Sequence, residues 1–167
     1  SIGKHHQVLI NVLTAWSGML EQLMRDDEAE TALIRANNIS QSTFGPNHQR
    51  FAYTLERLAL FYLGQTKYSK SLDLIEQAIE INKIIFGANH RKIALNWHNK
   101  SAVLNSMGRD EEAYDFALRS YNLFNELDEV SFDTLSSSVR NLSRLMDKRG
   151  QYDKSIVLLE SLLEKTK

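Results

Sequence analysis

The sequence of 167 residues contains no cysteine. A disulfide scaffold and a cysteine-ligated metal site are therefore excluded, and the absence is compatible with a reducing compartment, so we expect a cytoplasmic location. No apolar run approaches the roughly 20 residues that cross a bilayer, and the first residues lack the apolar stretch and cleavage site of a signal peptide. The sequence accordingly predicts no membrane partner.

The sequence also lacks an excess of either charge. Lys and Arg total 20 against 21 Asp and Glu, which gives a formal net charge of −1. Such a chain exerts no general attraction on nucleic acids or anionic membranes, and we predict no nucleic-acid partner. The contents of 43% apolar and 25% charged residues are those of an ordinary globular chain that can form a continuous core.

The common catalytic motifs are missing as well. We find no His-Glu-x-x-His, no Gly-rich phosphate loop and no Gly-x-Ser-x-Gly elbow, and we predict neither an enzyme nor a cofactor. Three of the five histidines, His6, His48 and His90, recur at one spacing. Equivalent positions of stacked helical units lie about 8–10 Å apart, whereas the ligands of one metal ion lie about 2 Å from it. We therefore predict no metal site, and place these histidines in turns.

What the sequence does contain is a repeat of 42 residues. Phe44-Gly45-Pro46-Asn47-His48, which holds the only proline, is repeated as Phe86-Gly87-Ala88-Asn89-His90, and the first residues resemble both as Ile2-Gly3-Lys4-His5-His6. A fixed period indicates a stacked array of like units. Small residues, which suit close approaches of two helices, recur in two series: Ser17, Ala59, Ser101 and Ser143, and Ala29, Ser71, Ala113 and Ser155.

Each unit has the pattern of two amphipathic helices. In the second unit, Phe51, Leu55, Leu58 and Tyr62 are spaced by three and four residues, which places them on one helical face. No strand is needed. The predicted helices span about 7–24, 27–42, 48–64, 68–85, 90–107, 110–126, 132–149 and 152–165.

The ends of these helices have their own signals. Asn47, Asn89 and Ser131 share one position of the repeat and are predicted N-caps, because a short side-chain oxygen accepts from exposed backbone N–H groups. Gly108 and Gly150 mark the turns within the third and fourth units, where a positive φ is tolerated.

The fold class that follows is all-α, an α-solenoid of four helix-turn-helix repeats. A globular bundle is the alternative, but a bundle has no reason to keep small residues at intervals of 42 residues. We expect one domain over 1–167, with repeats at about 2–43, 44–85, 86–127 and 128–167. Because the chain begins at Ser1, already inside a repeat, we expect it to be a piece of a longer protein.

At this point the sequence resembles a known family. The segment Leu55–Tyr62, followed by Gln65, Tyr68, Ser71 and Ala78, resembles a tetratricopeptide repeat. The repeat length and the Phe-Gly-x-Asn-His connector resemble the repeats of kinesin light chain, whose connector reads Gly-x-x-His-Pro. The resemblance is strongest over 44–127, moderate over 2–43 and weakest over 128–167, where the connector Gly and His are replaced; the connector proline is replaced by Gln7, Gln49 and Arg91.

The resemblance implies a right-handed superhelix whose concave groove is lined by the first helix of each repeat. In repeat register this gives a row of Thr14, Glu56, His98 and Arg140, and beside it Ala15, Arg57, Asn99 and Asn141. Chaperone-binding members carry a Lys-x-x-x-Asn pair where this chain has Thr14 and Gly18, so a chaperone-tail clamp is not expected. The predicted peptide-binding residues are Arg57, His98, Asn99, Arg140, Asn141, Arg144 and Lys148.

Two features of this set indicate a ligand class. Asn99 and Asn141 match an Asn of the family's Leu-Asn-Asn-Leu-Ala segment, and an amide can donate to and accept from a peptide backbone. Arg140, Arg144 and Lys148 are four residues apart and share one helical face, which favours an acidic peptide or a carboxylate. The alternative for both features is a solvated helix surface.

Several other residues depart from the pattern. Trp16 and Trp97 occupy apolar positions and are predicted to lie in the core, whereas Lys100 occupies such a position and is expected to extend its stem along apolar surface. The last predicted helix has too many apolar positions for a solvated terminal cap. We expect a further helix beyond Lys167 or self-association through this end.

The sequence therefore supports two functions. The first is a non-catalytic protein–protein interaction module, a scaffold or adaptor that holds a peptide or partner protein in the concave groove. The alternative is a structural module that self-assembles through its terminal helix, with contacts at Leu158 and Leu162.

Overall fold

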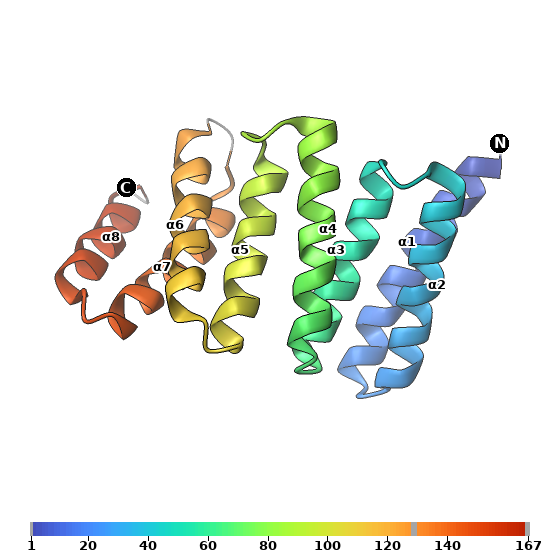
Figure 1. The fold of residues 1–167 in the computed structure, drawn as a ribbon, viewed down its shortest axis with the longest axis horizontal. Helices are drawn as coiled ribbons and strands as arrows, with labels where there is room; N and C mark the ends of the chain where they lie inside the picture. Colours follow the sequence, from blue (N-terminus) through green and yellow to red (C-terminus); the bar gives the residue numbers. More distant parts are fainter. Residues whose placement is uncertain (1, 128–129, 166–167) are drawn as a thin grey trace. The chain divides into compact units, whose positions relative to one another are not determined.

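The structure, a computed structural model, describes residues 2–127 and 130–165, and within them the chain forms eight α-helices and no strand (Figure 1). The all-α prediction is confirmed, and each predicted helix is present. The call signs of the ends differ by one or two residues except at the first helix. The helices are α1 (Ile2–Gln22), α2 (Asp26–Phe44), α3 (Gln49–Gly64), α4 (Tyr68–Phe86), α5 (Arg91–Ser106), α6 (Asp110–Glu126), α7 (Phe132–Lys148) and α8 (Tyr152–Glu164).

The first helix is longer than predicted. Residues 2–6, which resemble the connector of the later repeats, are helical, and α1 starts at Ile2 instead of about residue 7. The segment contains no proline to remove a backbone donor, and Gly3 has no positive φ, so nothing in it stops a helix. His6 keeps a turn contact nonetheless, because its Nδ1 lies 2.9 Å from Thr43 Oγ1 near the end of α2.

The helices group into two compact units, Ser1–Gly87 with α1 to α4 and Ala88–Lys167 with α5 to α8. We call them unit 1 and unit 2 and describe each by itself. In unit 1, α2 packs against both α1 and α3, and α3 packs against α4. In unit 2, α6 packs against α5 and α7, α7 packs against α8, and α5 also touches α7. No helix of the described residues is long and apolar enough to cross a membrane.

The two series of small residues lie where the two helices of a repeat meet, as predicted. All eight side chains are buried. The Ser71 hydroxyl donates to the Ala59 carbonyl at 2.6 Å, and Ser101 donates to the Ala113 carbonyl at 2.8 Å. These short contacts require small side chains, because a larger one would push the helix backbones apart.

The interface between α2 and α3 combines an apolar centre with polar pairs. Leu33 of α2 belongs to one buried cluster with Leu58 and Phe61 of α3. On either side of this cluster, the Tyr62 hydroxyl donates to Glu30 Oε1 at 2.8 Å, and the Thr54 hydroxyl donates to Asn37 Oδ1 at 2.9 Å. Burial and the Glu30 carboxylate raise the pKa of Tyr62 to about 12.

The N-caps of α3 and α5 differ from the prediction. His48 and His90 cap these helices in place of Asn47 and Asn89. Each imidazole Nδ1 accepts from the backbone N–H two residues on, of Arg50 or Lys92, at 3.1 Å. A ring nitrogen serves as well as an amide oxygen here, and the extended backbone needed by an N-cap falls one residue later. The prediction that the connector histidines lie in turns is correct, and Ser131 caps α7 as expected.

The turns within the repeats require a left-handed residue at one position. Gly108 and Gly150 have φ of 74° and 70°, as predicted. The same position holds Met24 and Thr66 in unit 1, both with φ of 57°. A β-branched residue in this region is strained by roughly 1–2 kcal/mol.

We therefore expect Thr66→Gly to stabilise the chain. Relief of the strained φ exceeds the extra chain entropy that glycine gives the unfolded state, and the gain should be up to about 1 kcal/mol. Thr66 is exposed, so no packing is lost. The measurement is the urea midpoint, with Gly108→Thr as the reciprocal variant, which should lower it. A lower midpoint for Thr66→Gly would show that the turn is unstrained.

Both tryptophans lie outside the core, so the prediction for them was wrong. Trp16 is 46% exposed and Trp97 is half-buried. The position of Trp16 is filled by the buried Leu58 in α3, which has α2 packed against it, whereas no described helix covers this side of α1. Lys100 does extend along apolar surface as expected, with Nζ 4.4 Å above the Phe116 ring.

Candidate functional site

The predicted binding residues gather mainly on one surface of unit 2, which we call the α5–α7 face. It is built from the first helices of the third and fourth repeats, which touch each other. Four of the seven predicted residues lie on α7, two lie on α5, and only Arg57 lies in unit 1. The α5–α7 face therefore contains His98, Asn99, Arg140, Asn141, Arg144 and Lys148.

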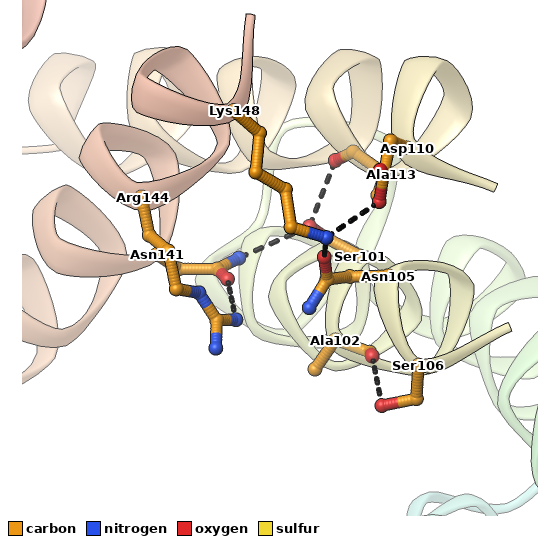
Figure 2. Close-up of polar contacts among 9 residues, drawn as sticks. All are labelled: Ser101, Ala102, Asn105, Ser106, Asp110, Ala113, Asn141, Arg144 and Lys148. Atoms are coloured by element: carbon orange, nitrogen blue, oxygen red, sulfur yellow. Dashed lines mark hydrogen bonds and ion pairs between the residues drawn. The ribbon is translucent and has the colours of Figure 1, made fainter. Parts of the chain in front are cut away.

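Asn141 joins the two helices of this face (Figure 2). Its side chain is buried, and its Nδ2 donates to the Ser101 hydroxyl at 3.0 Å. Ser101 in turn donates to the Ala113 carbonyl, and the Asn141 Oδ1 accepts from Arg144 Nη2 at 3.2 Å. The Asn141 amide is thus committed to holding α7 on α5 and to orienting Arg144.

Lys148 lies at the end of α7 and is paired within the chain. Its Nζ donates to Asn105 Oδ1 at 2.7 Å and to Asp110 Oδ1 at 2.9 Å, as Figure 2 shows. The Asp110 carboxylate balances the ammonium charge, so Lys148 adds little net charge to the face. The three basic residues of α7 are therefore not electrostatically equivalent.

Arg140 and Arg144 supply the remaining positive charge. Both side chains are exposed and lie one helical turn apart. Among the described residues, neither guanidinium is bonded to a carboxylate; Arg144 contacts Asn141, and no hydrogen bond or ion pair is recorded for Arg140. Surface arginines of this kind can form bidentate hydrogen bonds to carboxylates.

His98 lies beside this pair of arginines. Burial lowers the pKa of His98, and the positive charge of Arg144 lowers it further. The folded chain therefore favours the neutral imidazole, which has one donor and one acceptor nitrogen. Asn99, next to it on α5, is half-buried.

The lowered pKa of His98 predicts a pH dependence of stability. Because the pKa is lower in the folded state than the ordinary value of 6.5, the unfolded chain binds the proton more tightly. The contribution to stability is complete above 6.5 and is lost as the pH falls through the folded pKa. We expect His98→Gln to lose less unfolding free energy than the wild type when urea midpoints at about pH 7.5 and pH 5.5 are compared. Equal losses in the two proteins would contradict this origin.

Unit 1 has a corresponding surface between α1 and α3. A hollow of about 350 Å³ is lined there by Asn11, Thr14, Ala15, Gly18, Tyr53 and Arg57. The Arg57 Nη2 lies 4.0 Å from Glu21 Oε1, so its charge is partly balanced. This hollow is the smaller and more neutral counterpart of the α5–α7 face.

The predicted row of Thr14, Glu56, His98 and Arg140 is not uniformly exposed. Thr14 is buried, with its hydroxyl donating to the Ile10 carbonyl at 3.0 Å. Glu56 is also buried and accepts from Asn82 Nδ2 of α4 at 2.9 Å. Only Arg140 of this row is fully accessible, because the side chains packed around the row differ from repeat to repeat.

A second hollow in unit 1 was not predicted. It measures about 750 Å³ and combines apolar residues with carboxylates that recur at spacings of three and four along α4. That acidic spacing was the available sequence signal. The lining residues are Gln41, Pro46, Asn47, Phe51, Asp73, Glu76, Gln77, Glu80, Ile81 and Ile84.

Comparison with protein families identifies the repeats. A family model described as tetratricopeptide repeat matches residues 9–84 and again 50–126. The chain belongs to the tetratricopeptide repeat family. Members of this family are generally protein–protein interaction modules, which agrees with the coarse function predicted from the sequence.

Individual relatives agree with this family. The clustered mitochondria protein homolog of Xenopus tropicalis is 28% identical over 107 residues, which are 64% of this chain and only 8% of that protein. The chain thus spans a small part of this relative.

Solved structures show the same fold at low identity. BtubC (BKLC) from P. vanneervenii superposes with a TM-score of 0.84 at 17% identity, covering 95% of this chain and 63% of that one. A kinesin light chain from Podosopora anserina with nearly identical TPR-like repeats gives 0.82 at 17% identity, covering 93% and 73%. The resemblance to kinesin light chain repeats predicted from the connector is confirmed.

Proposed function

We propose that the α5–α7 face binds a carboxylate-bearing segment of a partner protein, which makes the chain a non-catalytic interaction module. The observation that supports this most is the pair of Arg140 and Arg144, two exposed guanidiniums one turn apart without a carboxylate partner among the described residues. Acidic groups elsewhere in unit 2 are already paired, as in Lys148 with Asp110 and Arg109 with Glu112.

The residues around this pair suit an extended peptide. Asn99 and the neutral His98 offer donors and acceptors for a peptide backbone, and the two arginines offer forked donors for an Asp, a Glu or a C-terminal carboxylate. Asn141 and Lys148 act at one remove, since they hold α7 in place. Arg57 in the hollow of unit 1 is a further contact for a longer ligand.

The test is a peptide-array screen with acidic and aromatic-acidic peptides, followed by fluorescence anisotropy on the peptides that bind. Arg140→Ala/Arg144→Ala should weaken binding at least about tenfold, because charge-assisted hydrogen bonds contribute about 1.5–3 kcal/mol each. Asn99→Ala should weaken binding less. Rising salt should also weaken binding to the wild type.

A matched control separates this face from general charge. Arg119→Ala/Lys154→Ala removes the same two charges from exposed positions on α6 and α8 of unit 2. We expect it to bind like the wild type. If both double variants lose affinity equally, or if neither does, the α5–α7 face is not the binding site.

A further inference from the structure

Two helix faces at the ends of the described chain are apolar and exposed. On α1, Val12, Trp16 and Met19 lie on one face and are 56%, 46% and 64% exposed. On α8, Ile156, Leu159 and Leu163 lie on one face and are 54%, 37% and 63% exposed. Leu158 and Leu162, which the sequence suggested as contact positions, are instead buried within unit 2, so that part of the prediction was wrong.

The repeat itself shows what each of these faces packs against elsewhere. One repeat after Val12, Trp16 and Met19 stand Thr54, Leu58 and Phe61, which form the α3 side of the α2–α3 interface. The α1 face therefore has the register of a surface that receives the second helix of a preceding repeat.

The α8 face has the opposite register. Three repeats before Ile156, Leu159 and Leu163 stand Glu30, Leu33 and Asn37, which form the α2 side of the same interface. The corresponding Tyr114 and Ala117 of α6 lie towards the fourth repeat: Ala117 is buried, and the Tyr114 ring lies 4.3 Å from the Arg149 guanidinium.

The two exposed faces are also chemically matched. Within unit 1, Thr54 and Asn37 form a polar pair. At the same two positions the exposed faces carry Val12 and Leu163, so both members have become apolar together. In the centre, Leu159 takes the place of Leu33, opposite Trp16 and Met19. A change on one face alone would leave a polar group against an apolar one, which is unfavourable when buried.

We propose that α8 of one copy of this chain docks on α1 of a second copy, in the register of the α2–α3 interface. The contact is head-to-tail, so each copy keeps one free face and can bind a further copy. The docking faces are distinct from the α5–α7 face, and the proposal is independent of peptide binding.

Complementation of two blocked variants tests the head-to-tail arrangement. Val12→Glu removes the α1 face and Leu163→Glu removes the α8 face, both at exposed positions, so folding should be kept, which circular dichroism checks. By light scattering during gel filtration, the wild type should exceed twice the 19.2 kDa of one chain as concentration rises. Each variant alone should stay at the mass of one chain. An equimolar mixture should reach twice that mass and stop, because only one intact pair of faces is available.

A matched variant on α8 controls for lost apolar surface. Val157→Glu changes a residue that is 64% exposed but lies at the position of the exposed Thr31, Asp73 and Asp115, away from the docking register. It should associate like the wild type. The proposal is overturned if the wild type stays monomeric, which would assign these faces to other occupants such as further repeats, or if Val12→Glu alone still self-associates, which would indicate a symmetric α8 contact. A mixture that stays monomeric while the wild type associates overturns it as well.

Discussion

Phe61→Ala should lower the free energy of unfolding by about 3–5 kcal/mol, the largest loss we expect from a single truncation in unit 1. The Phe61 ring is 2% exposed and belongs to the cluster that joins α3 to α2. It also packs edge-on to the Tyr62 ring at 5.6 Å. Truncation removes the transferred apolar area and leaves a cavity that close-packed helices can only partly fill.

Met19→Ala is the matched control, because Met19 holds the same position one repeat earlier and is 64% exposed. We expect a change within about 0.5 kcal/mol. Urea unfolding followed by circular dichroism, and by Trp16 fluorescence in a Trp97→Phe background, reports the effect in unit 1. The chain should be dilute enough to be monomeric, since Met19 lies on the proposed docking face. Similar losses in the two variants would show that repeat position, and not burial, sets the cost.

This contrast shows what the repeat period can and cannot predict. The period of 42 residues predicted all eight helices and the two buried series of small residues, because helix spacing and close approach depend on local sequence. Burial depends also on the neighbouring helix. Trp16 and Leu58 share a position, yet only Leu58 has another helix packed against it, so one is exposed and the other buried.

The candidate site shows the same limit. The register placed Asn99 and Asn141 at equivalent positions, but Asn99 is half-buried while Asn141 is buried against Ser101. Likewise, the spacing of Arg140, Arg144 and Lys148 predicted a common face correctly. It could not show that Lys148 pairs with Asp110, because that partner lies on another helix. Ligand-contacting and helix-holding residues are therefore separated by long-range packing.

The N-caps were missed for a more local reason. Asn47 and His48 are adjacent, and both side chains offer an acceptor of the right length. The backbone decides between them, since the residue with extended φ and ψ is His48, at −119° and 141°. Gly45, with φ of 87° and ψ of 170°, sets the path of the connector that leads there. This conformation is almost restricted to glycine, so the connector geometry depends on it.

Ala59→Leu should destabilise the chain by about 1–3 kcal/mol, although it makes the side chain more apolar. Ala59 is fully buried where α3 meets α4, and its carbonyl accepts from the Ser71 hydroxyl at 2.6 Å. Three added carbon atoms must either take an unfavourable rotamer or separate the helices, which would break this hydrogen bond.

Ala15→Leu is the control for this substitution, because Ala15 is exposed on α1 and both residue types favour helices. We expect its urea midpoint to match that of the wild type, while the midpoint of Ala59→Leu falls. Hydrogen exchange should locate the loss in α3 and α4. If Ala59→Leu were as stable as the wild type, the helices would not be close-packed at this position, and the recurrence of small residues every 42 residues would need a cause other than helix contact. A loss confined to Ala59→Leu would instead tie that period directly to the distance between the two helices of each repeat.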